Sequence, residues 1–292
     1  MHKFLRAIGF SQLKNSRQLN ELLTYSIKNA EEKLYISKED DTMFAQYFKS
    51  FGENIGITIC GEYDENNRFT MDYYYPYAKG LCISSYEDIT IERHAEKESY
   101  AGICDDVKVG VSLIFYLQNI VSYLKLKNAN RLPIKGTSLV LSALSNKGVI
   151  ILPIYKNEYD RKKITKDNIA RNHLLAAARK GDEEAIESLT LEDMDTYTTI
   201  SRRILKEDIF SLVDTCFMPY GVQCDQYSIL GEIVDCHLIS NQFTKEEVYQ
   251  LSVNCNDLIF EVYINKEDLM GEPQIGRRFK GIIWMQGYIN FP

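Results

Sequence analysis

The end of the chain carries the pattern that most restricts what this sequence can fold into. Apolar residues recur there at even spacing, which puts them on one face of a strand because successive side chains point to opposite faces. These residues are Phe279, Ile283, Met285, Ile289 and Phe291. Gly281 and Gly287 stand between them, and glycines inside a strand mark points where a sheet bends. The pattern predicts the closing strand of a small barrel.

The residues before this strand predict the rest of the barrel. Residues 227–238 and 248–255 alternate in the same way, and residues 258–264 form an apolar run after a polar turn. Asn265 is placed to cap a short helix. Three strands, a short helix and a strand resemble the order of an OB-type barrel in which one strand is missing or fused. We therefore expect a barrel-like (OB-like) β module over residues 222–292.

The first part of the chain mixes strand and helix patterns. Several stretches alternate with a period of two, whereas apolar residues at helical spacing predict a core helix over about residues 110–127. A polar turn at residues 145–148 predicts a hairpin formed by residues 137–142 and 149–155. We expect residues 1–155 to form a domain in which helices pack on a mixed sheet.

A charged stretch and helix signals separate these two parts. Residues 156–167 are polar and charged, which is typical of a linker. Gly181 and Asp182 stand where one helix would end and the next would begin. We assign residues 156–221 to a linker and helical connector. The predicted fold class is α+β, with this connector between the N-terminal mixed sheet-and-helix domain and the C-terminal β module.

Composition argues against several classes of function. The formal net charge of −7 opposes the phosphate backbone and disfavours nucleic acid as a partner. The seven cysteines include no Cys-x-x-Cys pair, the start shows no signal-peptide pattern, and no apolar run is long enough to span a bilayer. Glycine-rich phosphate loops are absent from the sequence. We expect a cytoplasmic protein with no membrane partner and no cofactor.

A basic turn near the single tryptophan is the first candidate site. Arg277, Arg278 and Lys280 lie close to Trp284 in the sequence, so positive charge and an aromatic face are available together for a phosphate or a nucleotide. The simpler interpretation is a turn whose basic residues pair with nearby acidic ones, while the indole packs between the barrel and its neighbour. Both interpretations stay open.

A histidine between glutamates is the second candidate. On a strand, Glu92, His94, Glu96 and Glu98 would project from one face, where they offer acid–base groups or metal ligands. The simpler interpretation is the solvated face of an edge strand, because charge protects such edges from pairing with other chains.

Two further clusters give weaker signals. Cys216, Cys224, Cys236 and His237 are too widely spaced for the paired ligands of a structural zinc site, so we expect no metal there. The tyrosines of residues 73–77 are typical of a half-buried sheet face, or of a contact patch through which the chain would form a homo-oligomer.

Four stretches of the chain resemble a known family. They are residues 1–11 (MHKFLRAIGFS), 110–118 (GVSLIFYLQ), 217–221 (FMPYG) and 276–287 (GRRFKGIIWMQG). Together they resemble a domain-of-unknown-function family of gut Firmicutes proteins, DUF3881, over essentially the full length. The resemblance implies a bacterial cytoplasmic protein, and it brings no activity, ligand or catalytic residue that can be carried over to this sequence.

The leading functional hypothesis is a non-catalytic binding or regulatory module whose partner is a protein or a small molecule. It rests on recognition-like residues without a recognisable reaction centre in the sequence. The first alternative is an enzyme with its site in a cleft between the two β-containing parts, using Glu92, His94 and Glu96. The second alternative is nucleic-acid or nucleotide binding through the basic turn.

Overall fold

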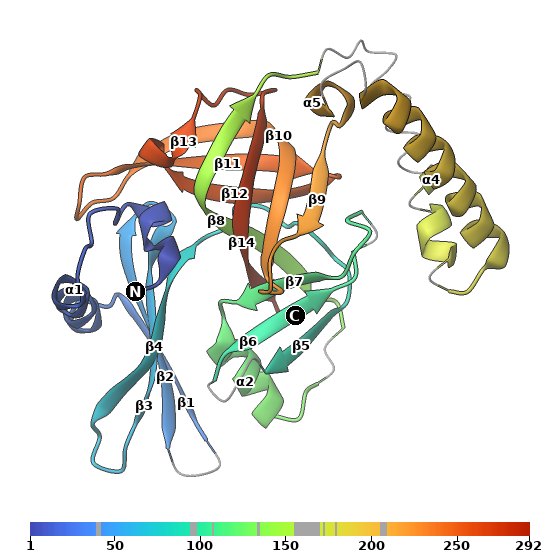
Figure 1. Cartoon of the computed structure of the whole chain (residues 1–292). Coiled ribbons are helices and arrows are strands. Elements are labelled where there is room, and N and C mark those ends of the chain that lie inside the picture. Colours follow the sequence, from blue (N-terminus) through green and yellow to red (C-terminus); the bar gives the residue numbers. More distant parts are fainter. Residues whose placement is uncertain are drawn as a thin grey trace.

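The protein is built mainly from β-strands, as its computed structural model shows for residues 1–38, 42–93, 98–106, 108–132, 135–154, 170–171, 173–178, 180–204 and 209–292 (Figure 1). The strands are β1 (Glu32–Ser37), β2 (Met43–Gly52), β3 (Ile55–Tyr63), β4 (Phe69–Ala78), β5 (Ile89–Arg93), β6 (Tyr100–Cys104), β7 (Leu113–Leu117), β8 (Ser138–Ile151), β9 (Cys216–Pro219), β10 (Gln226–Ser240), β11 (Glu247–Cys255), β12 (Leu258–Asn265), β13 (Leu269–Met270) and β14 (Arg278–Asn290). The helices are η1 (Lys3–Ile8), α1 (Ser16–Lys28), α2 (Ile120–Asn128), α4 (Glu183–Ile204), α5 (Ile209–Leu212) and η2 (Lys266–Asp268).

These strands form two sheets. The first is a four-stranded antiparallel sheet in the order β1-β2-β3-β4. The second is a ten-stranded sheet in the order β13-β8-β12-β11-β10-β14-β7-β6-β5, with β9 pairing beside β10. In Figure 1 the four-stranded sheet and the three strands β5 to β7 extend to the same side of the barrel, with α2 near the end of β6.

Five strands of the larger sheet close into a barrel with the ring order β10-β11-β12-β8-β14. β14 pairs antiparallel with both β10 and β8, and β8 closes the ring by pairing parallel with β12. The α+β class with a barrel-like module is therefore confirmed. The strand missing from the C-terminal pattern is β8, which comes from the first part of the chain. An OB-type barrel has the same ring, but its fifth strand follows the other four instead of preceding them.

The interior of the barrel is packed around two phenylalanines, Phe260 and Phe279, which are fully buried. The ring of Phe279 lies against Gly281 of its own strand, β14, and against Gly148 of the paired strand, β8. A Cβ added at Gly148 would stand 2.4 Å from this ring, and one added at Gly281 would stand 2.6 Å from it. Only glycine leaves room for the ring at these positions, so the strands can approach closely enough to close the barrel.

The expected helix over residues 110–127 is wrong for its first half. Residues Leu113–Leu117 form strand β7, and the helix α2 begins only at Ile120. Leu113 and Leu117 are four residues apart, a spacing that fits a helix, but Phe115 between them is also buried and gives the period of two. The i,i+4 spacing of two residues is compatible with either structure.

The expected hairpin of residues 137–142 and 149–155 is also wrong. One continuous strand, β8, runs through the proposed turn at residues 145–148. Gly148 does not have a positive φ, which a tight hairpin turn would need, and its role is instead to leave space for the ring of Phe279.

Buried glutamines connect the two sheets. The side-chain amide of Gln118 donates to Gln286 Oε1 (2.8 Å) and to the carbonyl oxygen of Ala78 at the end of β4 (2.7 Å). Gln286 on β14 donates in turn to the carbonyl oxygen of Pro76 (2.8 Å). Buried polar groups that are satisfied in this way fix one relative position of the elements that carry them. The domain boundaries at residues 155 and 221 stay a prediction, although strands from both sides of them share one sheet.

The structure describes only part of the helical connector expected over residues 156–221. Gly181 has a φ of +87°, and the side chain of Asp182 accepts hydrogen bonds from the backbone N–H groups of Glu184 and Ala185 at the start of α4. These contacts are those expected for a helix stop followed by a helix cap. The expected linker at residues 156–167 lies outside the described residues. α4 extends beside the barrel (Figure 1), and no helix within the described ranges is long and apolar enough to cross a membrane.

Candidate ligand-binding cavity

A cavity of about 650 Å³ lies where the start of the chain meets β5–β7 and the segment before β10. Its lining comes from segments that are far apart in the sequence. These lining residues are Met1, His2, Lys3, Phe4, Glu92, Arg93, Tyr100, Ala101, Ile103, Ile114, Tyr116, Val222, Gln223, Cys224, Asp225, Gln226 and Trp284. The volume is within the range of about 300–1,000 Å³ that is typical of small-molecule sites.

The floor of the cavity is the outer face of β6 and β7. In both strands the side chains alternate between buried and half-buried positions, so one face packs into the core and the other is left open. The open face carries Ala101, Ile103, Ile114 and Tyr116. The floor is therefore mostly apolar.

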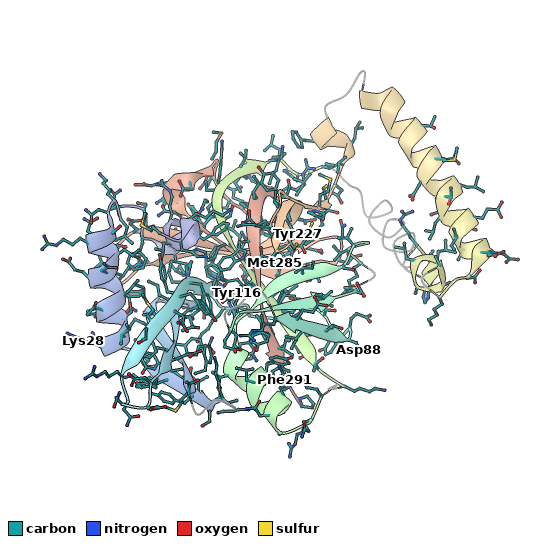
Figure 2. The ribbon with its side chains drawn as sticks, turned by 60° about the horizontal axis from the view of Figure 1, so that its bottom comes forward. Lys28, Asp88, Tyr116, Tyr227, Met285 and Phe291 are labelled. Carbon is teal, nitrogen blue, oxygen red and sulfur yellow. The ribbon has the colours of Figure 1, made fainter. Side chains whose placement is uncertain are left out.

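Tyr227 of β10 holds β7 in place under this floor. Its hydroxyl donates to the carbonyl oxygen of Ile114 (3.0 Å) and accepts a hydrogen bond from the backbone N–H of the same residue (2.7 Å). Figure 2 labels this tyrosine together with Tyr116. Burial raises the pKa of Tyr227 to about 12, so the hydroxyl stays protonated at neutral pH and continues to donate.

One wall of the cavity is aromatic and is centred on Trp284. The indole is only 5% exposed, and its ring centroid lies 4.8 Å from that of His2 and 5.4 Å from those of Phe4 and Tyr116. Its Nε1–H donates to a carboxylate oxygen of Asp225 (2.6 Å). Most of the indole surface is therefore covered by the rings of His2, Phe4 and Tyr116. His2 and Tyr116 also line the cavity and extend its aromatic wall.

His2 is a neutral group in this wall. Burial lowers the pKa of its imidazole to about 4, and the positive charge of Lys3 adds to this effect. Its Nδ1 accepts a hydrogen bond from the backbone N–H of Phe4 (3.4 Å), where the side chain caps η1. Because Nδ1 is the acceptor, the ring proton of the neutral imidazole is on Nε2.

The rim of the cavity is polar and carries both signs of charge. On one side the ammonium of Lys3 donates to the side-chain oxygens of Gln226 (3.0 Å) and Gln223 (3.3 Å). On the other side lie Glu92 and Arg93 at the end of β5, and the guanidinium of Arg93 pairs with Glu98. A ligand in this cavity would meet an apolar floor, an aromatic wall and a charged entrance.

The four residues of the predicted basic site are separated. Trp284 lines the cavity, whereas Arg278 is buried and donates to the backbone carbonyls of Leu152, Phe210 and Val213. Arg277 donates to the carbonyl oxygen of Glu272, and the ammonium of Lys280 lies 4.3 Å from the ring centroid of Phe210. Arg278 thus stabilises the junction between the barrel and α5, and ligand binding by the remaining residues stays a prediction.

Of the predicted acid–base or metal site, the structure describes only Glu92 among the residues Glu92, His94 and Glu96. Glu92 lies on β5 and lines the same cavity as Trp284, so residues from both candidate sets meet there. His94 and Glu96 lie outside the described residues. Across the parts of the chain that the structure covers, no group of three or more metal-ligating side chains is close enough to hold an ion.

Several lining residues were not predicted from the sequence. His2, Lys3, Tyr116 and Asp225 belong to no motif that indicates a binding site, and each lines the cavity together with residues from segments far apart in the chain. The alternation in Leu113–Leu117 is the one local signal that indicates an open strand face at Tyr116, once β7 is recognised as a strand.

Comparison with known protein families gives a match over most of the chain. The family model described as "Domain of unknown function, E. rectale Gene description (DUF3881)" matches residues 5–287. No curated protein and no solved structure matches the chain.

Proposed function

The chain belongs to the DUF3881 family of domains of unknown function, and from the geometry of its own cavity we propose that it is a binding or regulatory protein for a small molecule. The observation that supports this is the open face of β6 and β7, which would otherwise expose apolar surface at the bottom of an aromatic-walled cavity. A concave, mostly apolar site with a few polar groups at its edge is the usual form of a small-molecule site.

The proposed location is the cytoplasm of a bacterium. Two observations support it. All seven cysteines are free thiols, and three of them, Cys60, Cys104 and Cys255, are buried in the core. Chains that use unpaired cysteines in this way are typical of reducing compartments. The proposed partner is a small molecule, and regulation of a protein partner would follow from ligand binding at the junction of the N-terminal segment and the barrel.

A ligand screen read by thermal unfolding tests the proposal. Ligands that bind only the folded state raise its stability, by about 2.7 kcal/mol at a hundredfold excess over Kd. We expect metabolites that bind in the cavity to raise the Tm of the wild type. Ala101→Phe, which places a ring on the cavity floor, should abolish that rise.

The matched control is Thr70→Phe, which adds the same ring at an exposed position of β4, away from the cavity. This variant should keep the full ligand-induced rise in Tm. If Ala101→Phe and the wild type respond equally to every stabilising ligand, the cavity is not the binding site and the proposal is wrong.

The same screen also tests the alternative that the protein is an enzyme, which is supported by the position of Glu92 in the cavity. Mass spectrometry of the recovered ligand distinguishes the two functions. Unchanged ligand after prolonged incubation indicates a binding protein. Conversion that is lost in Glu92→Gln, with binding retained, would make Glu92 an acid–base group of an enzyme.

A further inference from the structure

We propose that the ligand of this cavity is an amphipathic anion, whose apolar body lies on the β6–β7 floor and whose negatively charged group pairs with Lys3 and the Nε2–H of His2. This inference rests on the proposed function, because it names the chemical class of the ligand for the same cavity. Three features of the site support it.

The first feature is the way in which Lys3 is held. Its ammonium contacts two amide oxygens, those of Gln223 and Gln226, and no carboxylate among the residues that the structure describes. Amide oxygens orient the ammonium without neutralising it, so its full charge remains available at the cavity. A third hydrogen-bond donor of the ammonium is left for a ligand, since a lysine side chain has three.

The second feature is the neutral imidazole beside it. With Nδ1 accepting from the backbone of Phe4, the proton on Nε2 is a donor, and none of the described protein groups accepts it. His2 and Lys3 are neighbours in the chain and both line the cavity. The lining therefore includes two residues that carry hydrogen-bond donors, and Lys3 adds one positive charge.

The third feature is the placement of the acidic groups. Asp225 accepts the indole N–H of Trp284 at 2.6 Å, so this carboxylate is committed to fixing the aromatic wall. Glu92 lies on β5 and lines the cavity, as does its neighbour Arg93, whose guanidinium pairs with Glu98. The lining thus contains a lysine with no carboxylate partner among the described residues, whereas Asp225, the acid beside the aromatic wall, has a partner within the protein.

Two fluorescent probes with the same aromatic rings test the charge preference. Anilinonaphthalene sulfonate carries one negative charge, and phenylnaphthylamine is its neutral counterpart. In fluorescence titrations of the whole chain of residues 1–292, we expect the wild type to bind the anionic probe more tightly than the neutral one. Lys3→Gln should weaken the anionic probe about 10-fold, which is the usual effect of losing one charge-assisted hydrogen bond, and should leave the neutral probe unchanged. Lys3→Arg should restore most of the affinity.

The outcomes separate the two proposals. If Ala101→Phe has no effect on either probe, the cavity does not bind them and the proposed function itself fails. If Ala101→Phe blocks both probes but Lys3→Gln affects them equally, the cavity is real and the anion preference is wrong. Tighter binding of a trimethylammonium derivative of the same rings would also overturn the inference, because a cationic ligand would then be favoured.

Discussion

Glu261 shows how a single buried acid contributes to the pH dependence of stability. It lies on the covered face of β12, where the hydroxyl of Ser252 is within hydrogen-bond distance of both carboxylate oxygens, 2.8 and 3.0 Å away. Burial raises its pKa, and the hydrogen bonds from Ser252 and Gln250 offset that rise only in part. The folded state therefore binds this proton more tightly than the unfolded chain does.

The sign of the effect follows from proton linkage. Because the pKa of Glu261 is higher in the folded state, the group reduces stability as pH rises through the unfolded pKa of about 4.3 and the folded pKa. Glu261→Gln removes the charge and keeps an acceptor for Ser252. We expect this variant to be more stable than the wild type at pH 8 in urea unfolding, with the difference shrinking towards zero below about pH 4.

Glu65→Gln is the control for this prediction, because Glu65 is exposed in the turn between β3 and β4. Its stability should follow the wild type at both pH values. A Glu261→Gln variant that is less stable than the wild type at pH 8 would show that the ionised carboxylate stabilises the fold, contrary to the burial argument.

At the scale of elements, the pairing of β8 with β14 depends on the space that Gly148 leaves for Phe279. The ring is fully buried, so it cannot move aside for a methyl group 2.4 Å away. Gly148→Ala should lower the free energy of unfolding by about 1–3 kcal/mol, the usual cost of overpacking a core. Denaturant unfolding followed by circular dichroism measures this loss.

A double-mutant cycle identifies the cause of the loss. Phe279→Leu removes part of the ring that meets the new methyl group, so Gly148→Ala should cost less in this background than in the wild type. Equal costs in both backgrounds would mean that the loss arises from the backbone of β8 and not from contact with Phe279.

The same glycine explains which elements could be predicted from the sequence. Alternation predicts β10, β11 and β14, and an apolar run after a polar turn predicts β12. In β8 the glycine that accommodates a ring from another strand was interpreted as a turn. Glycine has several structural uses, and the partner that distinguishes them lies 131 positions further along the chain, at Phe279.

At the scale of the whole molecule, the barrel is assembled from two separate parts of the sequence. Residues 209–292 lack β8, so a fragment with these residues alone would expose the paired edges of β12 and β14. We expect fragments 1–154 and 170–292 to show no cooperative unfolding transition when expressed separately. Co-expressed, they should form a one-to-one complex with native circular dichroism, which size-exclusion chromatography with light scattering can detect.

A C-terminal fragment that folds cooperatively by itself would contradict this expectation. It would instead support the domain boundary at residue 221. Like the barrel, the cavity is formed by segments that are far apart in the sequence. Its lining combines the first residues of the chain with β5–β7, the segment before β10 and Trp284. Local chemistry was enough to select Glu92 and Trp284 as candidates, but their meeting in one cavity depends on sheet pairing across most of the chain.

The position of β8 in the chain also determines when the barrel can close during synthesis. β8 leaves the ribosome before any of its barrel partners, and the last of them, β14, is the final strand. At translation rates of about 5–20 residues per second, roughly ten seconds pass before the pairing of β8 with β14 can form. The edges of β8 that pair with β12 and β14 are exposed during this time, so we expect slower translation to increase aggregation of the nascent chain.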